Sequence, residues 1–101
     1  PVQIHSRRGD AQGIIADLSQ GGCRMAVDVR GHQNLRQTVA GDMLVMRIPL
    51  NSDGVPVSVS CTVRSVDLDP AKMTLGLSFT EGDDDFWKSL NLFMDNSALL
   101  P

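Results

Sequence analysis

Cysteine and histidine are scarce in this sequence, and their placement argues against cross-links and metal sites. The two cysteines, Cys23 and Cys61, form no CxxC pair, and each lies within a strand-like apolar pattern. We therefore expect two buried, reduced thiols, although the sequence alone leaves a disulfide between them open. His5 and His32 have no metal-ligand spacing with each other or with the cysteines, so we predict no zinc site.

Long apolar runs are also absent. No stretch approaches the ~18 residues that a membrane-spanning helix requires, and no signal peptide is recognisable. We expect a cytoplasmic protein with no direct membrane insertion. No acid–base pair, metal-ligand cluster or activated nucleophile is recognisable, so we predict a non-catalytic protein without a cofactor. The chain opens at Pro1 directly into an apolar alternation, which we interpret as the start of a piece of a longer protein.

The chain has fewer basic than acidic residues. The net charge of −3 and the pI of about 5.1 argue against DNA binding and against anionic membranes, since both need a basic face. The cations are unevenly distributed, however, because arginines outnumber lysines and most of them precede residue 50. A planar guanidinium pairs with phosphate through two hydrogen bonds. The first half of the chain is therefore suited to holding a small anion.

Alternation of apolar and polar residues with period two predicts about six half-buried strands. The clearest segment runs from Val55 to Val66. The residues predicted to face inward are Val2 and Ile4; Ile14, Ala16 and Leu18, paired with Cys23, Met25 and Val27; Leu44, Met46, Ile48 and Leu50; Val55, Val57, Val59, Cys61 and Val63; and Met73, Leu75, Leu77 and Phe79.

Turn residues separate these segments. Short turns are predicted at residues 8–10, 19–22, 51–54 and 67–72, and a longer polar connection with a short helical turn before Gly41 is predicted at residues 30–42. Repeated short strands with short turns indicate an all-β sandwich or barrel.

One helix is predicted after the last strand, from about residue 83 to about residue 97. Its apolar residues are Phe86, Trp87, Leu90, Phe93 and Met94, which share one face at helical spacing. This face either covers an open end of the sheet structure or forms a surface for a dimer or another partner.

The segment from Asp17 to Gly22 carries the strongest functional signal. Alternation turns Leu18 inward, so Asp17 and Ser19 point to the outer face, and two glycines follow. A carboxylate accepts hydrogen bonds from the N1–H and the exocyclic amine of a guanine. On chemistry alone, the favoured interpretation is a turn in which both side chains bond the local backbone.

This segment resembles the [D/N]xSxxG motif of the PilZ domain family through Asp17, Ser19 and Gly22. The string Leu75-Gly76-Leu77-Ser78-Phe79 resembles the late LGxxF strand of the same family. The resemblance covers nearly the whole chain. It implies an all-β fold, a six-stranded antiparallel Greek-key-like β-barrel with one C-terminal α-helix, as one domain over residues 1–101 with the barrel at about 1–80.

The resemblance also implies a ligand. In the family, the Asp and the Ser of the motif contact a guanine of cyclic di-GMP and the glycines shape the turn, which implies these roles for Asp17, Ser19, Gly21 and Gly22. Arg24 alternates to the same outer face and is a candidate contact to a phosphate or a purine; alternatively, it is a solvated residue of the barrel wall.

The sequence departs from the family pattern in one respect. The family's RxxxR motif, whose arginines clamp phosphates, normally lies just before the first barrel strand, and no two arginines near the start have this spacing. Arg7 and Arg8 are adjacent and are expected in the first turn. We expect an RxxxR motif shortly before Pro1 in the longer protein.

The leading prediction is a cyclic di-GMP-binding sensor module that regulates a partner domain or protein. The alternative is a degenerate PilZ-like interaction module that binds no nucleotide and uses the barrel wall or the helix, with a homodimer as one form of it. The sequence does not indicate which output is controlled.

Overall fold

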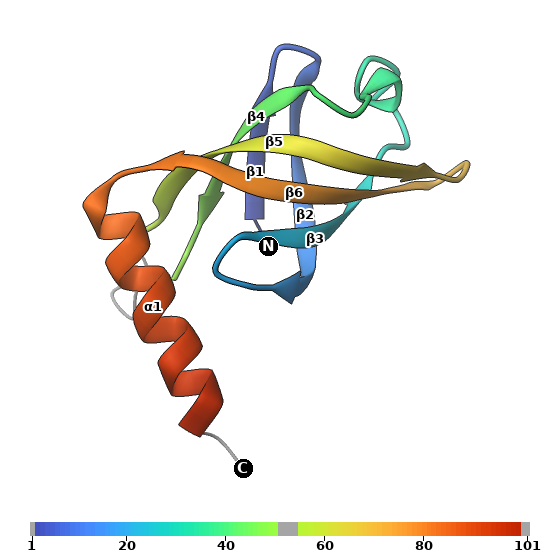
Figure 1. The fold of residues 1–101 in the computed structure, drawn as a ribbon. Helices are drawn as coiled ribbons and strands as arrows, with labels where there is room; N and C mark the ends of the chain where they lie inside the picture. Colours follow the sequence, from blue (N-terminus) through green and yellow to red (C-terminus); the bar gives the residue numbers. More distant parts are fainter. Residues whose placement is uncertain (1, 51–54, 100–101) are drawn as a thin grey trace.

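The computed structural model describes residues 2–50 and 55–99, with side chains up to residue 95 (Figure 1). Its strands are β1 (Val2–Ser6), β2 (Gly9–Leu18), β3 (Gly22–Asp28), β4 (Met43–Ile48), β5 (Val57–Leu68) and β6 (Lys72–Gly82). They form a closed antiparallel barrel in the order β1-β2-β3-β6-β5-β4. The predicted fold class, a six-stranded barrel followed by one helix, is confirmed.

Two antiparallel meanders make the barrel, and the connection between them determines its topology. After β3 the chain crosses to β4 through a 3-10 turn at Leu35–Gln37, the short helical turn that the polar stretch predicts. β4 then pairs with both β1 and β5. The pairing of β3 with β6 joins the last strand of the first meander to the last strand of the second. The predicted turn at residues 51–54 lies outside the described residues.

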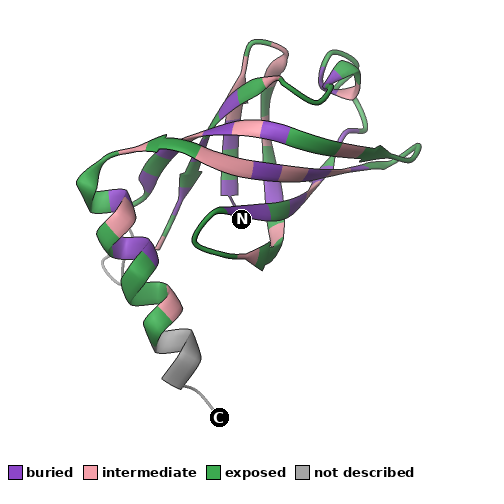
Figure 2. Ribbon diagram, in the orientation of Figure 1, coloured by how far each residue is buried: buried purple, intermediate pink, exposed green. Residues whose placement is uncertain are grey.

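The core is aliphatic and lies inside the barrel (Figure 2). The alternation predicts the inward residues of β3, β4 and β6 correctly, and those of β5 from Val57 to Val63. The largest fully buried side chains include Ile4, Met25, Leu35, Met46, Met73, Leu75, Phe86 and Leu90. Both cysteines are buried and unbonded, as predicted; burial raises the pKa of Cys23 to about 11 and that of Cys61 to about 12.

Three residues that were predicted to face inward are exposed instead. Ile14 is 71% exposed and Ala16 is exposed, because a bulge interrupts the pairing of β2 with β3 between Ile15 and Asp17. Before the bulge the inward set is odd-numbered and includes Ile15, whereas after it Leu18 turns inward. Val55 is 58% exposed, because it precedes β5.

The connection between β3 and β4 is tied to the first hairpin by Asp42. Its carboxylate accepts hydrogen bonds from Arg8 Nε at 2.7 Å and Arg8 Nη2 at 3.3 Å, and from the backbone N–H of Val39 at 3.1 Å. Arg7 lies at 3.7 Å from the same carboxylate. Both arginines lie at the β1–β2 turn, where they were predicted.

The helix α1 (Asp84–Leu99) packs on the barrel through one face, which carries Phe86, Leu90 and Met94. The Asp83 carboxylate caps it by accepting a hydrogen bond from the Phe86 N–H at 2.8 Å. Phe86 and Leu90 are buried in the core, whereas Phe93 is 43% exposed. The predicted interpretation as a cover for the barrel therefore applies to the face of α1 that runs from Phe86 to the partly buried Met94. The far end of α1 extends away from the strands (Figure 1).

Three aromatic rings join β6 to the base of α1. The ring of Phe79 lies edge-on to Phe86 at 5.2 Å and to Trp87 at 6.4 Å, and the Trp87 indole N–H donates to the Gly82 carbonyl at 3.1 Å. No described helix is both long and apolar enough to cross a membrane.

We expect Phe86→Ala to lower the free energy of unfolding by about 3–5 kcal/mol, because it leaves a cavity between α1 and the barrel. Phe93→Ala is the matched control, and its exposed side chain predicts a change of about 0.5 kcal/mol or less. Urea denaturation of both variants measures the difference. Equal effects would show that the first turn of α1 is not part of the core.

The Asp42 contacts predict a loss of stability in acid. Arg8, and after it the Val39 N–H, hold the pKa of Asp42 below its ordinary value of 3.8. Because the folded-state pKa is the lower one, this contribution to stability is complete above pH 3.8 and is lost as the pH falls through the folded-state pKa. The difference in unfolding free energy between wild type and Asp42→Asn should therefore shrink below pH 3.8, as measured by urea denaturation across pH. Asp67→Asn, which changes an exposed carboxyl of β5, should not reproduce it.

Candidate functional site

The bulge in β2 directs the Asp17 carboxylate outward. It lies opposite Arg24 of β3, as the alternation predicts, and the two side chains are 77% and 65% exposed. Arg24 Nη1 is 3.8 Å from Asp17 Oδ2. An exposed ion pair of this length contributes little to stability, so both groups remain available to another partner.

Ser19 and Gly22 close the turn that follows. Gly22 O accepts hydrogen bonds from the Ser19 N–H at 2.9 Å and from the Ser19 hydroxyl at 3.2 Å. The hydroxyl therefore has the local role that the turn interpretation assigned to it. Its oxygen retains lone pairs that can accept a hydrogen bond from a ligand.

The two glycines of the turn are under different constraints. A Cβ on Gly22 would overlap the carbonyl oxygen of Leu77, so β3 and β6 approach closely only with glycine there. A Cβ on Gly21 would meet nothing, and the Gly21 carbonyl accepts a hydrogen bond from the Phe79 N–H at 2.9 Å. The close approach thus explains Gly22, while Gly21 contributes its backbone.

These residues line an open hollow of about 560 Å³ on the outer face of the barrel, across β3, β6 and β5. The structure brings all five predicted site residues into it. It adds residues from two later strands that the sequence analysis did not select: Arg64, Ser65, Gly76 and Ser78. Alternation had placed Arg64, Gly76 and Ser78 on outer faces, but only the strand order brings β5 and β6 beside the motif.

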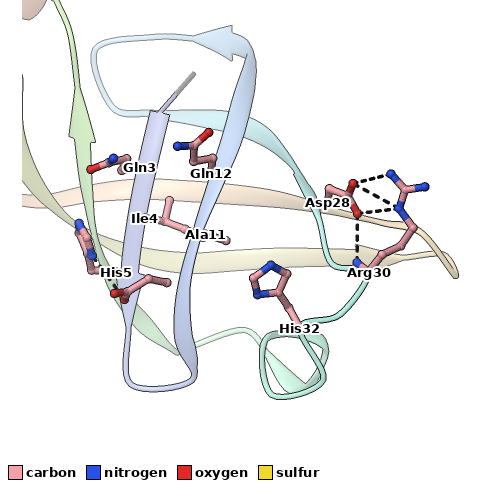
Figure 3. A pocket seen from close by; sticks show the side chains of 9 residues that line it. Gln3, Ile4, His5, Ala11, Gln12, Asp28, Arg30 and His32 are labelled. Carbon is pink, nitrogen blue, oxygen red and sulfur yellow. Dashed lines mark hydrogen bonds and ion pairs between the residues drawn. The ribbon is translucent and has the colours of Figure 1, made fainter.

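A second hollow, of about 470 Å³, lies between the β1–β2 hairpin and the segment after β3 (Figure 3). Its charged groups pair with each other. Asp28 accepts several hydrogen bonds from Arg30, which lower the pKa of Asp28 to about 2, and His5 Nδ1 lies 3.3 Å from Asp10. Arg30 points away from His32 and the hairpin in this view. Among the described residues, the lining of the hollow at the motif carries two arginines, Arg24 and Arg64, and one carboxylate, Asp17, and therefore suits an anion better.

Metal chemistry has no support from the side chains that the structure describes. Among them, no three histidine, cysteine or acidic residues are grouped in a way that would hold an ion.

A closed six-stranded barrel with an exposed Asp–Ser–Gly turn over an open hollow is the arrangement of a small binding domain. Comparison with models of protein families matches residues 1–95 to the PilZ domain. The chain therefore belongs to the PilZ domain family, a family of cyclic di-GMP receptor domains and not of catalysts. No curated protein matches the chain.

The contrast between the glycines gives a test of the turn. We expect Gly22→Ala to lower the free energy of unfolding by about 1–3 kcal/mol, since the added methyl group forces β3 away from the Leu77 carbonyl. Gly21→Ala, one residue earlier and facing open space, should change it by about 0.5 kcal/mol or less. Urea denaturation compares the two, and an equal loss would contradict the close approach of β3 and β6.

Proposed function

We propose that this chain is a cyclic di-GMP-binding sensor module and that the hollow beside Asp17 is its ligand site. The observation that carries the proposal is the exposed Asp17 carboxylate at the rim of a hollow shaped by Gly22, in a chain that belongs to the PilZ domain family. The ligand has guanine edges that a carboxylate recognises and phosphates that arginines recognise.

In this proposal Asp17 exchanges partners when the ligand binds. The N1–H and exocyclic amine of a guanine donate two hydrogen bonds to the carboxylate, which are stronger than its contact with Arg24 at 3.8 Å. Arg24 is then released toward a phosphate or the face of the purine. Ser19 and the backbone of Gly21 and Gly22 hold the carboxylate beside the base.

The course of β1 supports a contribution from residues ahead of the barrel. Val2 pairs with Gly13, and because the strands are antiparallel, the chain before Val2 points along β2 toward Asp17. An RxxxR motif located just before Pro1 would therefore reach the hollow.

Binding would order such an arm against the barrel wall and so change its contacts with a neighbouring domain or protein. This is the regulatory step of the proposal, and it takes place in the cytoplasm. It needs no catalytic group and no cofactor.

One observation favours the alternative, an interaction module. The outer part of α1 exposes apolar side chains, with Leu92 at 64% and Phe93 at 43%. Such a face can bind a protein partner or a second copy of the chain without any nucleotide.

The test of the proposed function is the Asp17→Ala variant in the full-length protein. We expect its affinity for cyclic di-GMP to fall by about 1.5–3 kcal/mol, since hydrogen bonds from two donors to a charged acceptor are lost. Asp10→Ala removes an exposed carboxylate at the other hollow and should leave the affinity unchanged. Titration calorimetry measures both, and wild-type affinity in Asp17→Ala would reject this ligand site.

A further inference from the structure

Arg64 is a cation of the hollow that has no carboxylate partner among the residues that the structure describes. The ion pairs of these residues include Arg24, which lies near Asp17, but not Arg64. The charged side chains that line the hollow are Asp17, Arg24 and Arg64, so its lining carries a net charge of +1. This net charge favours an anionic ligand. The group that supplies it is Arg64, which is on β5 and away from the motif.

The guanidinium of Arg64 is held at one end and open at the other. Its Nε–H donates to the Ser78 hydroxyl of β6 at 2.9 Å. The two terminal nitrogens keep four N–H donors, and the side chain is exposed. A guanidinium anchored in this way has lost part of its rotational freedom before a ligand arrives, and its free edge matches two oxygens of a phosphate.

β6 lies between Arg24 and Arg64, and the residue of β6 opposite Arg24 is a glycine, Gly76. Gly76 of β6 is paired with Arg24 of β3 on one side and with Ser65 of β5, next to Arg64, on the other. A Cβ on Gly76 would overlap the Ser65 hydroxyl. Gly76 adds no side chain of its own, and the Ser65 hydroxyl occupies the space where its Cβ would be. A flat ligand can therefore lie across β6 in contact with this hydroxyl, with a guanidinium at each edge.

We infer that Arg64 binds a phosphate of the ligand, on the opposite side of the hollow from Asp17, and that Ser78 is the residue that positions it. This inference rests on the proposed function, because it takes the ligand to be a guanine nucleotide with two phosphodiester groups. Asp17 then holds the base, and Arg24 and Arg64 contact the backbone of the ligand on either side of Gly76.

The test is titration calorimetry of cyclic di-GMP with the full-length protein and two matched variants. Arg64→Ala should weaken binding by about 10- to 100-fold. Arg47→Ala removes the same charge from an exposed position on β4, outside the hollow, and should stay within about twofold of wild type. Arg64→Lys should fall between wild type and Arg64→Ala, since an ammonium keeps the charge but loses the paired donors. Thermal unfolding of each variant verifies that it is folded.

Salt dependence separates a phosphate contact from a structural effect. The affinity of wild type should fall as salt is added, the slope should be smaller for Arg64→Ala, and Arg47→Ala should keep the wild-type slope. Ser78→Ala should weaken binding less than Arg64→Ala and should have no effect in the Arg64→Ala background.

The outcomes separate this inference from the proposed function. If Asp17→Ala weakens binding as expected while Arg64→Ala and Arg47→Ala behave alike, the role of Arg64 is rejected and the ligand site stands. If the wild-type protein does not bind cyclic di-GMP, both are rejected. A loss in Arg64→Ala with an unchanged salt slope also rejects a phosphate contact.

Discussion

The antiparallel pairing of β3 with β6 is the contact on which the rest of the structure depends. It joins two meanders whose other strand pairing, among the described residues, is that of β1 with β4, and so it closes the barrel around the aliphatic core. It also creates the hollow, since Asp17 and Arg24 come from one meander while Arg64 and Ser78 come from the other. The close approach needs a residue without a side chain at its start, and Gly22 meets that need next to the Leu77 carbonyl. Fold and site therefore have a common origin.

Most of the fold could be predicted because a barrel wall imposes a strict alternation on its strands. β4 follows that rule along its whole length and β6 follows it from Met73 to Phe79, and their inward residues were predicted correctly. Beyond Phe79 the register of β6 with β5 shifts. β2 does not follow the rule, because the bulge after Ile15 exchanges its inward and outward faces partway along the strand. A single sequence shows the alternation but not the extra residue, since Ile14, Ile15 and Ala16 are all apolar and either phase fits.

The candidate site could be predicted only in part, for a related reason. The segment from Asp17 to Gly22 is contiguous, so its chemistry can be recognised in the sequence. Arg64 lies 47 positions after Asp17 in the printed sequence and reaches the same hollow only through the strand order. The alternation of apolar and polar residues along β5 correctly predicted that Arg64 faces outward. No local pattern, however, tells which outward residues of different strands become neighbours. The roles of Asp17, Ser19, Gly21, Gly22 and Arg24 in binding stay predictions.

The hydrogen bond from the Phe79 N–H to the Gly21 carbonyl has a thermodynamic consequence. The backbone of Phe79 is bonded to Gly21, which lines the hollow, and its ring belongs to the aromatic cluster at the base of α1. Any change in the turn that weakens this bond also changes the free energy with which β6 holds the helix. Coupling of this kind is reciprocal: if the proposed ligand at the turn changes the affinity of α1 for a partner by some factor, that partner changes the affinity of the turn for the proposed ligand by the same factor. In this domain, a change at the turn and a change at the helix therefore affect each other.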